Sequence, residues 1–177
     1  SLPSPGTPPT LPRALSFDTI RGAAAGDYDV QFVGSTNRDI LFAINEGKDG
    51  ATSFVIADAG NDTIDLVDST GVVGKFTVKG GAGDDIITAL TSAGGGANAR
   101  FDSASITAGA GQDTITSLGA VSSILKGNED ADNFALQGNY TNSTITGNQG
   151  EDSFTLNGAI TLEDTFIRAG SGNDGVI

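Results

Sequence analysis

A nine-residue pattern recurs six times in this chain of 177 residues, and each copy follows a Gly-rich turn with an Asp. The clearest copy reads GGAGDDIIT at positions 80–88, and the Asp residues of successive copies are 19 to 28 residues apart. A period near 20 residues suits one coil of a solenoid, in which each coil buries its apolar face only against its neighbours. The other copies are ADAGNDTID (57–65), AGAGQDTIT (108–116), GNEDADNFA (127–135), GNQGEDSFT (147–155) and AGSGNDGVI (169–177).

Apolar residues keep the same register in every copy. One apolar residue stands two positions after the Asp, and another stands two positions before the nonapeptide begins. The first set is Ile64, Ile87, Ile115, Phe134, Phe154 and Val176, and the second is Val55, Val78, Ile106, Leu125, Ile145 and Ile167. The segments around them alternate between apolar and polar residues, which is typical of a strand with one buried face. The sequence therefore predicts an all-β fold, a right-handed parallel β-solenoid of roughly six to eight coils.

Three regions differ in composition. Residues 1–12 contain all five prolines and predict an extended linker or tail. Residues 13–56 are less regular and predict N-terminal capping coils. Residues 57–177 hold the repeats, and because the last copy ends at Ile177 we expect an open edge there that pairs with another chain or with further coils.

The composition argues against several classes of function. The net charge of −13 makes nucleic acid and anionic membranes poor partners. There is no His and no Cys, which excludes Ser-His-Asp and Cys-His catalysis, disulfides, and imidazole or thiolate zinc sites. Arg100 and Arg168 are the Arg residues among the repeats, and neither lies in a basic cluster. No apolar run is long enough to span a membrane. We therefore predict that the chain is not an enzyme.

The repeated Asp residues need a compensating charge. In a stacked solenoid they lie roughly 4.8 Å apart, where two carboxylates repel by about 0.9 kcal/mol in water and about 3.5 kcal/mol at an effective dielectric of 20. No copy carries Lys or Arg within its nonapeptide. A divalent cation could offset the repulsion, and calcium prefers carboxylate and carbonyl oxygens. The alternative is a metal-free turn in which Asp accepts hydrogen bonds from nearby N–H groups.

The pattern at residues 80–88 resembles the RTX, or haemolysin-type, calcium-binding repeat, G-G-x-G-x-D-x-U-x, at every defined position. The resemblance covers roughly residues 50–177 and implies a parallel β-roll or β-helix with calcium bound between turns. It differs from the family in having one nonapeptide per coil, so that only one edge could carry metal. By this resemblance the expected metal ligands are Asp62, Asp85, Asp113, Asp132, Asp152 and Asp174, with carbonyls of the turns that contain Gly60, Gly83, Gly111, Gly150 and Gly172.

These observations predict a non-catalytic structural or adhesive module of a secreted, cell-surface or virion appendage, such as an adhesin, a surface-layer protein, or a phage fibre or decoration protein. Its partners would be other protein subunits, further copies of the chain joined end to end, or cell-surface glycans. Two alternatives stay open. One is a carbohydrate-binding accessory module of a polysaccharide-active enzyme, although the chain has no Trp and only Tyr28 and Tyr140 as tyrosines. The other is a metal-free β-helix scaffold.

Overall fold

The computed structural model describes residues 16–21, 31–34, 36–38, 40–44, 53–68, 72–74, 76–91 and 100–177. Every regular element among them is a strand, and none forms a helix long and apolar enough to cross a membrane. The Pro-rich residues 1–12 and parts of the predicted capping region 13–56 lie outside the described residues.

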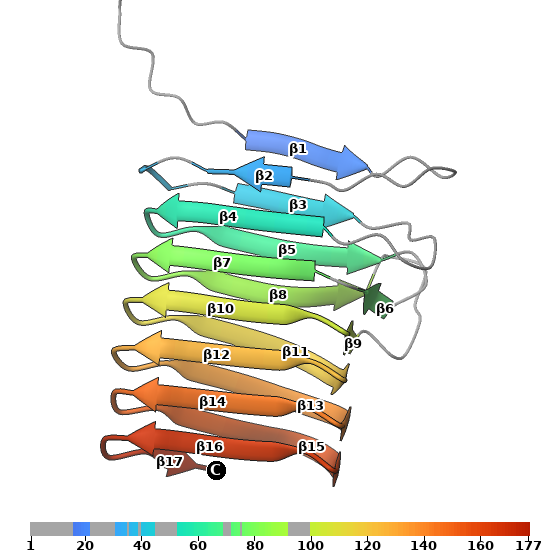
Figure 1. Ribbon diagram of the computed structural model, residues 1–177, viewed down its shortest axis with the longest axis vertical. Coiled ribbons are helices and arrows are strands. Elements are labelled where there is room, and N and C mark those ends of the chain that lie inside the picture. The colour runs from blue at the N-terminus through green and yellow to red at the C-terminus, as the bar shows by residue number, and fades with distance from the viewer. Residues whose placement is uncertain are drawn as a thin grey trace, which may run out of the picture.

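The strands form two parallel sheets that face each other across one narrow core (Figure 1). The seven-stranded sheet contains β2 (Gln31–Val33), β4 (Ser53–Ala59), β7 (Phe76–Ala82), β10 (Ser105–Ala110), β12 (Ile124–Glu129), β14 (Thr144–Gln149) and β16 (Phe166–Ser171). The ten-stranded sheet contains β1 (Ser16–Arg21), β3 (Ile40–Ile44), β5 (Thr63–Asp68), β6 (Val72–Gly74), β8 (Ile86–Thr91), β9 (Arg100–Asp102), β11 (Thr114–Val121), β13 (Asn133–Thr141), β15 (Ser153–Glu163) and β17 (Gly175–Val176).

The chain alternates between the sheets, and each nonapeptide makes the turn from the seven-stranded sheet to the ten-stranded sheet. The result is the right-handed parallel β-solenoid that the sequence predicts, seen in Figure 1 as front strands that run left and rear strands that run right. It has about five turns, slightly fewer than the predicted six to eight coils.

The two predicted apolar sets form the core. In the ten-stranded sheet the parallel register pairs Ile64 with Ile87, Ile87 with Ile115, and Phe134 with Phe154. These side chains are buried, whereas Val176 in the last strand is exposed. The facing set in the seven-stranded sheet is buried from Val55 to Ile145 and half-buried at Ile167. Alternating strands therefore place one file of apolar side chains from each sheet inside, as a period of two residues requires.

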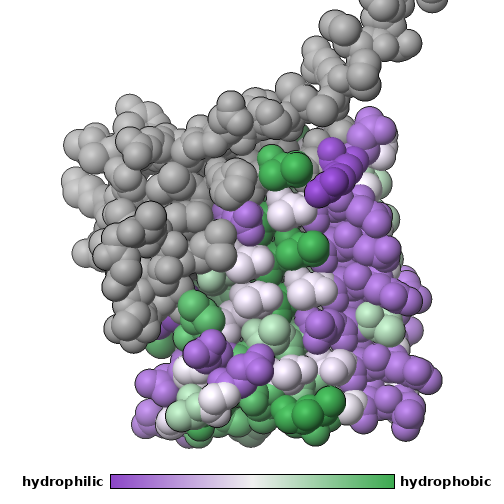
Figure 2. All heavy atoms as spheres, turned by 180° about the vertical axis from the view of Figure 1, so that it is seen from behind, coloured by the Kyte–Doolittle hydropathy of each residue, from purple (hydrophilic) through white to green (hydrophobic). Residues whose placement is uncertain are grey.

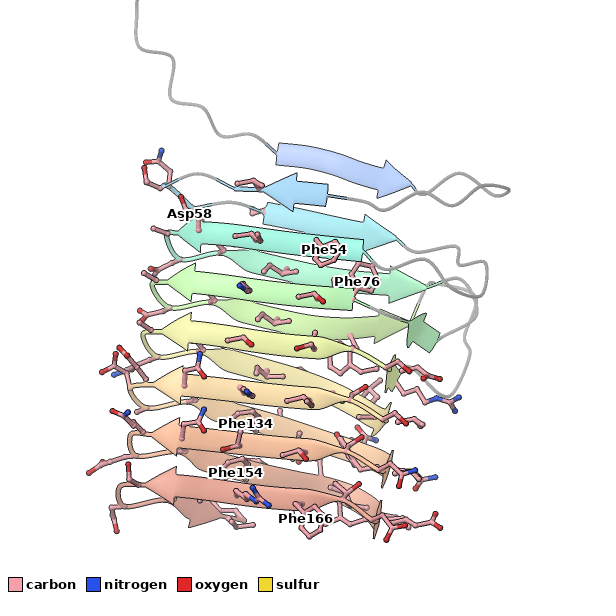
Figure 3. All side chains as sticks on the ribbon, viewed as in Figure 1. Phe54, Asp58, Phe76, Phe134, Phe154 and Phe166 are labelled. Carbon is pink, nitrogen blue, oxygen red and sulfur yellow. The ribbon has the colours of Figure 1, made fainter. Side chains whose placement is uncertain are left out.

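Stacking of like residues continues along the core. The rings of Phe134 and Phe154 lie 4.7 Å apart between centroids and within 8° of parallel, and Figure 3 shows them one above the other. Tyr140, one of the two tyrosines, is also buried and donates its hydroxyl to the carbonyl of Ser117 at 3.0 Å. The core thus uses its aromatic residues for packing between coils.

Replacing Phe134 by Ala should lower the free energy of unfolding by about 3–5 kcal/mol, because the cavity lies between two coils that cannot close around it. The matched control is Phe166→Ala, since Phe166 is 59% exposed on the outer face, and the expected loss there is within about 0.5 kcal/mol. Denaturant unfolding of both variants checks this. Equal losses at the two positions would contradict the assignment of Phe134 to the core.

Candidate functional site: the Asp ladder

The six repeated Asp residues form one continuous hydrogen-bonded column, called here the Asp ladder: Asp62, Asp85, Asp113, Asp132, Asp152 and Asp174. The backbone N–H of each Asp donates to Oδ1 of the Asp in the next coil, at N–O distances of 2.8 to 3.0 Å. The first five of these Asp side chains are buried. The sequence-predicted column is therefore assembled, and it lies inside the turn edge of the solenoid.

Glycine at the fourth position of the nonapeptide is required by both conformation and stacking. Gly83 has φ +123°, in the region that L side chains rarely adopt. A β carbon on Gly83 would also collide with the carbonyl oxygen of Gly60 in the preceding coil. A β carbon on Gly111 would collide in the same way with the carbonyl oxygen of Gly83, and one on Gly172 with that of Gly150. These glycines therefore have a structural reason that is independent of any metal.

The divergent copy at residues 127–135 fits the same turn. Asp130 takes the place of the fourth glycine and adopts φ +68°, the left-handed region that Asp and Asn visit most readily among residues with a side chain. Its carbonyl oxygen occupies the space where a β carbon on Gly150 would lie. The turn geometry is thus preserved where the sequence departs from the pattern.

The second carboxylate oxygen of the ladder has no hydrogen-bond partner in the middle coils. Oδ2 is buried and unpartnered in Asp85, Asp113, Asp132 and Asp152. A buried ionised carboxylate oxygen without a partner is costly, because it has lost water and gained nothing in exchange. The ladder therefore needs a positive charge or a proton at each of these oxygens.

Burial raises the pKa of the ladder carboxyls. It raises the pKa of Asp85 to about 6, and those of Asp113 and Asp132 to about 7. The hydrogen bond from the N–H of the preceding Asp lowers each pKa, and repulsion from neighbouring acidic side chains raises it again. The pKa of Asp152 is also raised, mainly by burial. Proton and metal would hence compete for these oxygens near neutral pH.

Small residues leave room beside each carboxylate. The first position of the nonapeptide points inward and is Ala or Gly in every copy: Ala57, Gly80, Ala108, Gly127, Gly147 and Ala169. A β carbon on Gly80 would collide with Asp85 Oδ2 and also with the carbonyl oxygen of Ala108 in the next coil. At Gly147 the same collision would involve Asp152 Oδ2 and the carbonyl of Ala169.

Two oxygen acceptors from neighbouring coils therefore converge beside Gly80 and beside Gly147. Neither can donate to the other while the carboxylate is ionised. Calcium ligands in proteins are carboxylate and carbonyl oxygens, so this donor set fits the cation that the sequence predicts. At each of these points the chain supplies fewer oxygens than the six to eight that calcium takes. In the described residues no group of three or more acidic side chains gathers around one point.

The turns also carry an outer row of polar side chains. Asp84 accepts from the backbone N–H of Gln112 at 3.0 Å, and it accepts from the side-chain amide of Asn61 at 3.3 Å. Figure 2 shows hydrophilic residues covering this edge of the molecule. The outer row satisfies backbone groups at the surface and leaves the inner ladder screened from water.

One further turn was not predicted from the sequence. Ile40 pairs with Thr63 and Leu41 with Ile64, which places the segment before β3 in the register of the nonapeptide turns. Asp39 precedes Asp62 by 23 residues, the same separation as that between Asp62 and Asp85. That spacing was the available signal. The fourth position is Asn37 instead of Gly, which hid the pattern, and position 39 itself lies outside the described residues.

A second ladder on the opposite edge was also missed. Here the backbone N–H of Ala104 donates to Ser123 Oγ, that of Ser123 donates to Ser143 Oγ, and that of Ser143 donates to Thr165 Oγ1, at 3.1 to 3.2 Å. Each hydroxyl in turn donates to a backbone carbonyl two residues earlier, at 2.8 to 3.0 Å. This hydroxyl ladder (Ser123, Ser143 and Thr165) accepts backbone N–H groups between coils at its edge, as the Asp ladder does at the other edge, but its side chains carry no charge.

The chain matches no protein-family model, and comparison with curated proteins and with solved structures likewise gave no match.

In the presence of a chelator, stability should fall as the pH rises from about 4 to about 8. A carboxyl whose folded pKa lies near 7, above the ordinary 3.8, is held neutral by the fold, and ionising it therefore favours the unfolded chain. Thermal melting across this range measures the effect. Asp113→Asn keeps an oxygen for the N–H of Asp85 but cannot ionise, and should flatten the curve. A stability that rises with pH through this window would contradict the burial of neutral carboxyls.

Proposed function

We propose that the chain is a non-catalytic structural module whose Asp ladder is neutralised by calcium held inside the turns. The observation that carries this proposal is the buried, unpartnered Oδ2 that recurs in Asp85, Asp113, Asp132 and Asp152. The RTX-like pattern at residues 80–88 supports the same cation, and so does the donor set of carboxylate and carbonyl oxygens beside Gly80 and Gly147.

The comparison of the two edges strengthens the argument for a cation. The hydroxyl ladder satisfies the same kind of backbone N–H with a side chain that can also donate. A hydroxyl would therefore suffice at the Asp positions if pairing between coils were the only requirement. Asp adds a second oxygen and a negative charge, and burying both in a turn costs free energy unless a cation binds to them.

The architecture supports our proposal of a stiff rod in a secreted, cell-surface or virion appendage. Repeated coils in parallel register give an elongated body that can be lengthened by adding coils. Adhesin, surface-layer, and phage fibre or decoration proteins are the classes that need such a body. The chain lacks His and Cys, and its titratable ladder lies inside the turns instead of in an open cleft. This supports a module that acts by binding and not by catalysis.

Calcium should stabilise the module. Millimolar calcium is expected to raise the melting temperature relative to EGTA, with a gain of about 1.4 kcal/mol for each site at a tenfold excess over its dissociation constant. Calorimetric titration gives the number of sites. Asp152→Asn should reduce that number and the thermal gain. The control is Glu151→Gln, which removes a neighbouring exposed carboxylate and should leave both unchanged.

An absence of binding heat, together with an unchanged melting temperature at millimolar calcium, would refute calcium binding. If the pH dependence in chelator persisted in that case, the metal-free scaffold with protonated carboxyls would be the correct reading.

A further inference from the structure

Three cations of this acidic chain stand in one straight row on the outer face of the seven-stranded sheet. The register pairs Lys79 with Thr107 and Thr107 with Lys126, and it then pairs Lys126 with Thr146 and Thr146 with Arg168. These five residues, called here the Lys/Thr row, belong to five successive strands from β7 to β16. A cation and a hydroxyl thus alternate along the solenoid axis.

The cations of the row are available for binding. Lys79, Lys126 and Arg168 are exposed, and the one ion pair found in the described part of the chain joins Arg100 and Asp102 instead. Arg168 lies over the ring of Phe166, with 5.6 Å between the guanidinium carbon and the ring centroid. Its side chain is therefore held against the face while its N–H groups remain exposed.

The neighbouring row of the same face is uncharged. Running parallel to the Lys/Thr row, it consists of Phe54, Thr77, Ser105, Ile124, Thr144 and Phe166. Figure 3 shows Phe54 and Phe166 near the two ends of this face. Neither row contains Asp or Glu, although the chain has 22 of them. These two rows therefore form a strip with positive charge along one side and hydroxyl and apolar groups along the other.

The spacing of the cations restricts what this strip can bind. Cations on every second strand lie roughly 9.6 Å apart, twice the distance between neighbouring strands. Nucleic acid carries a phosphate about every 3.4 Å along each strand, so most of its charges would face no cation and would be repelled by the net charge of −13. Two successive sugar units of an extended polysaccharide span about the distance between these cations, and the intervening Thr hydroxyls can bond to sugar hydroxyls.

We propose that the Lys/Thr row binds a linear anionic polysaccharide, lying along the solenoid axis, that carries a carboxylate on every second sugar. Lys79, Lys126 and Arg168 pair with successive carboxylates, and Thr107 and Thr146 bond to the sugars between them. The inference is independent of calcium in the turns, because the row lies on the outer face of the sheet and uses no residue of the Asp ladder.

The test uses hyaluronan oligosaccharides, which have one carboxylate per disaccharide, with heparin, single-stranded DNA and neutral dextran as comparisons. Calorimetry or a gel-shift assay with the full chain, at one fixed calcium concentration, should show binding to hyaluronan that weakens as salt is added. Lys126→Ala removes the central cation and should lower the affinity roughly tenfold, as expected for a charged hydrogen-bonded contact. Thr146→Val should lower it by a smaller factor.

The control is Arg100→Ala, which removes one half-buried positive charge, paired with Asp102, from β9 in the other sheet. It should leave the affinity unchanged. All variants lie at exposed or half-buried outer positions, and melting curves establish that each is folded. Equal loss with Arg100→Ala, equal binding of DNA and hyaluronan, binding of dextran, or no binding of hyaluronan at low salt would each overturn the proposal. Loss of binding with Lys126→Ala at an unchanged melting temperature would support it.

Discussion

The hydrogen bond from the backbone N–H of each ladder Asp to the carboxylate of the next coil is the interaction on which the rest of the structure depends. Each ladder residue from Asp85 to Asp152 is both a donor and an acceptor, so one residue type repeated at one position fixes the distance and the register between coils. Once the register is fixed, like apolar residues stack from coil to coil and the core becomes a continuous file. Glycine at positions 80, 127 and 147 is required for the same reason, because the carboxylate of the same coil occupies the space of a β carbon there.

The Asp ladder has opposing effects on stability, because its hydrogen bonds favour the fold whereas burial of its carboxylates disfavours it. Accepting a backbone hydrogen bond stabilises one oxygen of Asp113, yet burial raises its pKa to about 7 because the second oxygen has lost its solvent. Lys and Arg lie elsewhere on the described surface, so neutralisation has to come from a bound cation or from protons. The opposite edge avoids the conflict with hydroxyls such as Ser143, which accept from one backbone group and donate to another.

The sequence predicted the parts of this fold that depend on short-range regularities. The two apolar files and the Asp ladder follow from alternation and from a fixed offset within each nonapeptide, and the structure confirms both. The turn before β3 was missed because Asn37 stands in the place of the fourth glycine. The burial of Tyr140 and the hydroxyl ladder were missed because Ser, Thr and Tyr are common on either face of a strand. The Lys/Thr row was also missed, although each of its residues stands just before a nonapeptide, so that the fixed offset of the repeats was the available signal.

Inner and outer residues of the same strands are subject to different constraints. In β12, Leu125 and Gly127 point inward, where the core and the ladder dictate their size, whereas Ile124 and Lys126 point outward, where packing requires nothing of them. Like charges on neighbouring strands are avoided by the intervening Thr107 and Thr146, so the cations can be aligned at little cost to the fold. A cation row without acidic partners, in a chain with a net charge of −13, does not arise from the demands of the solenoid. The outer face of the seven-stranded sheet is thus the surface on which the fold constrains the residues least, and it is there that we propose a ligand binds.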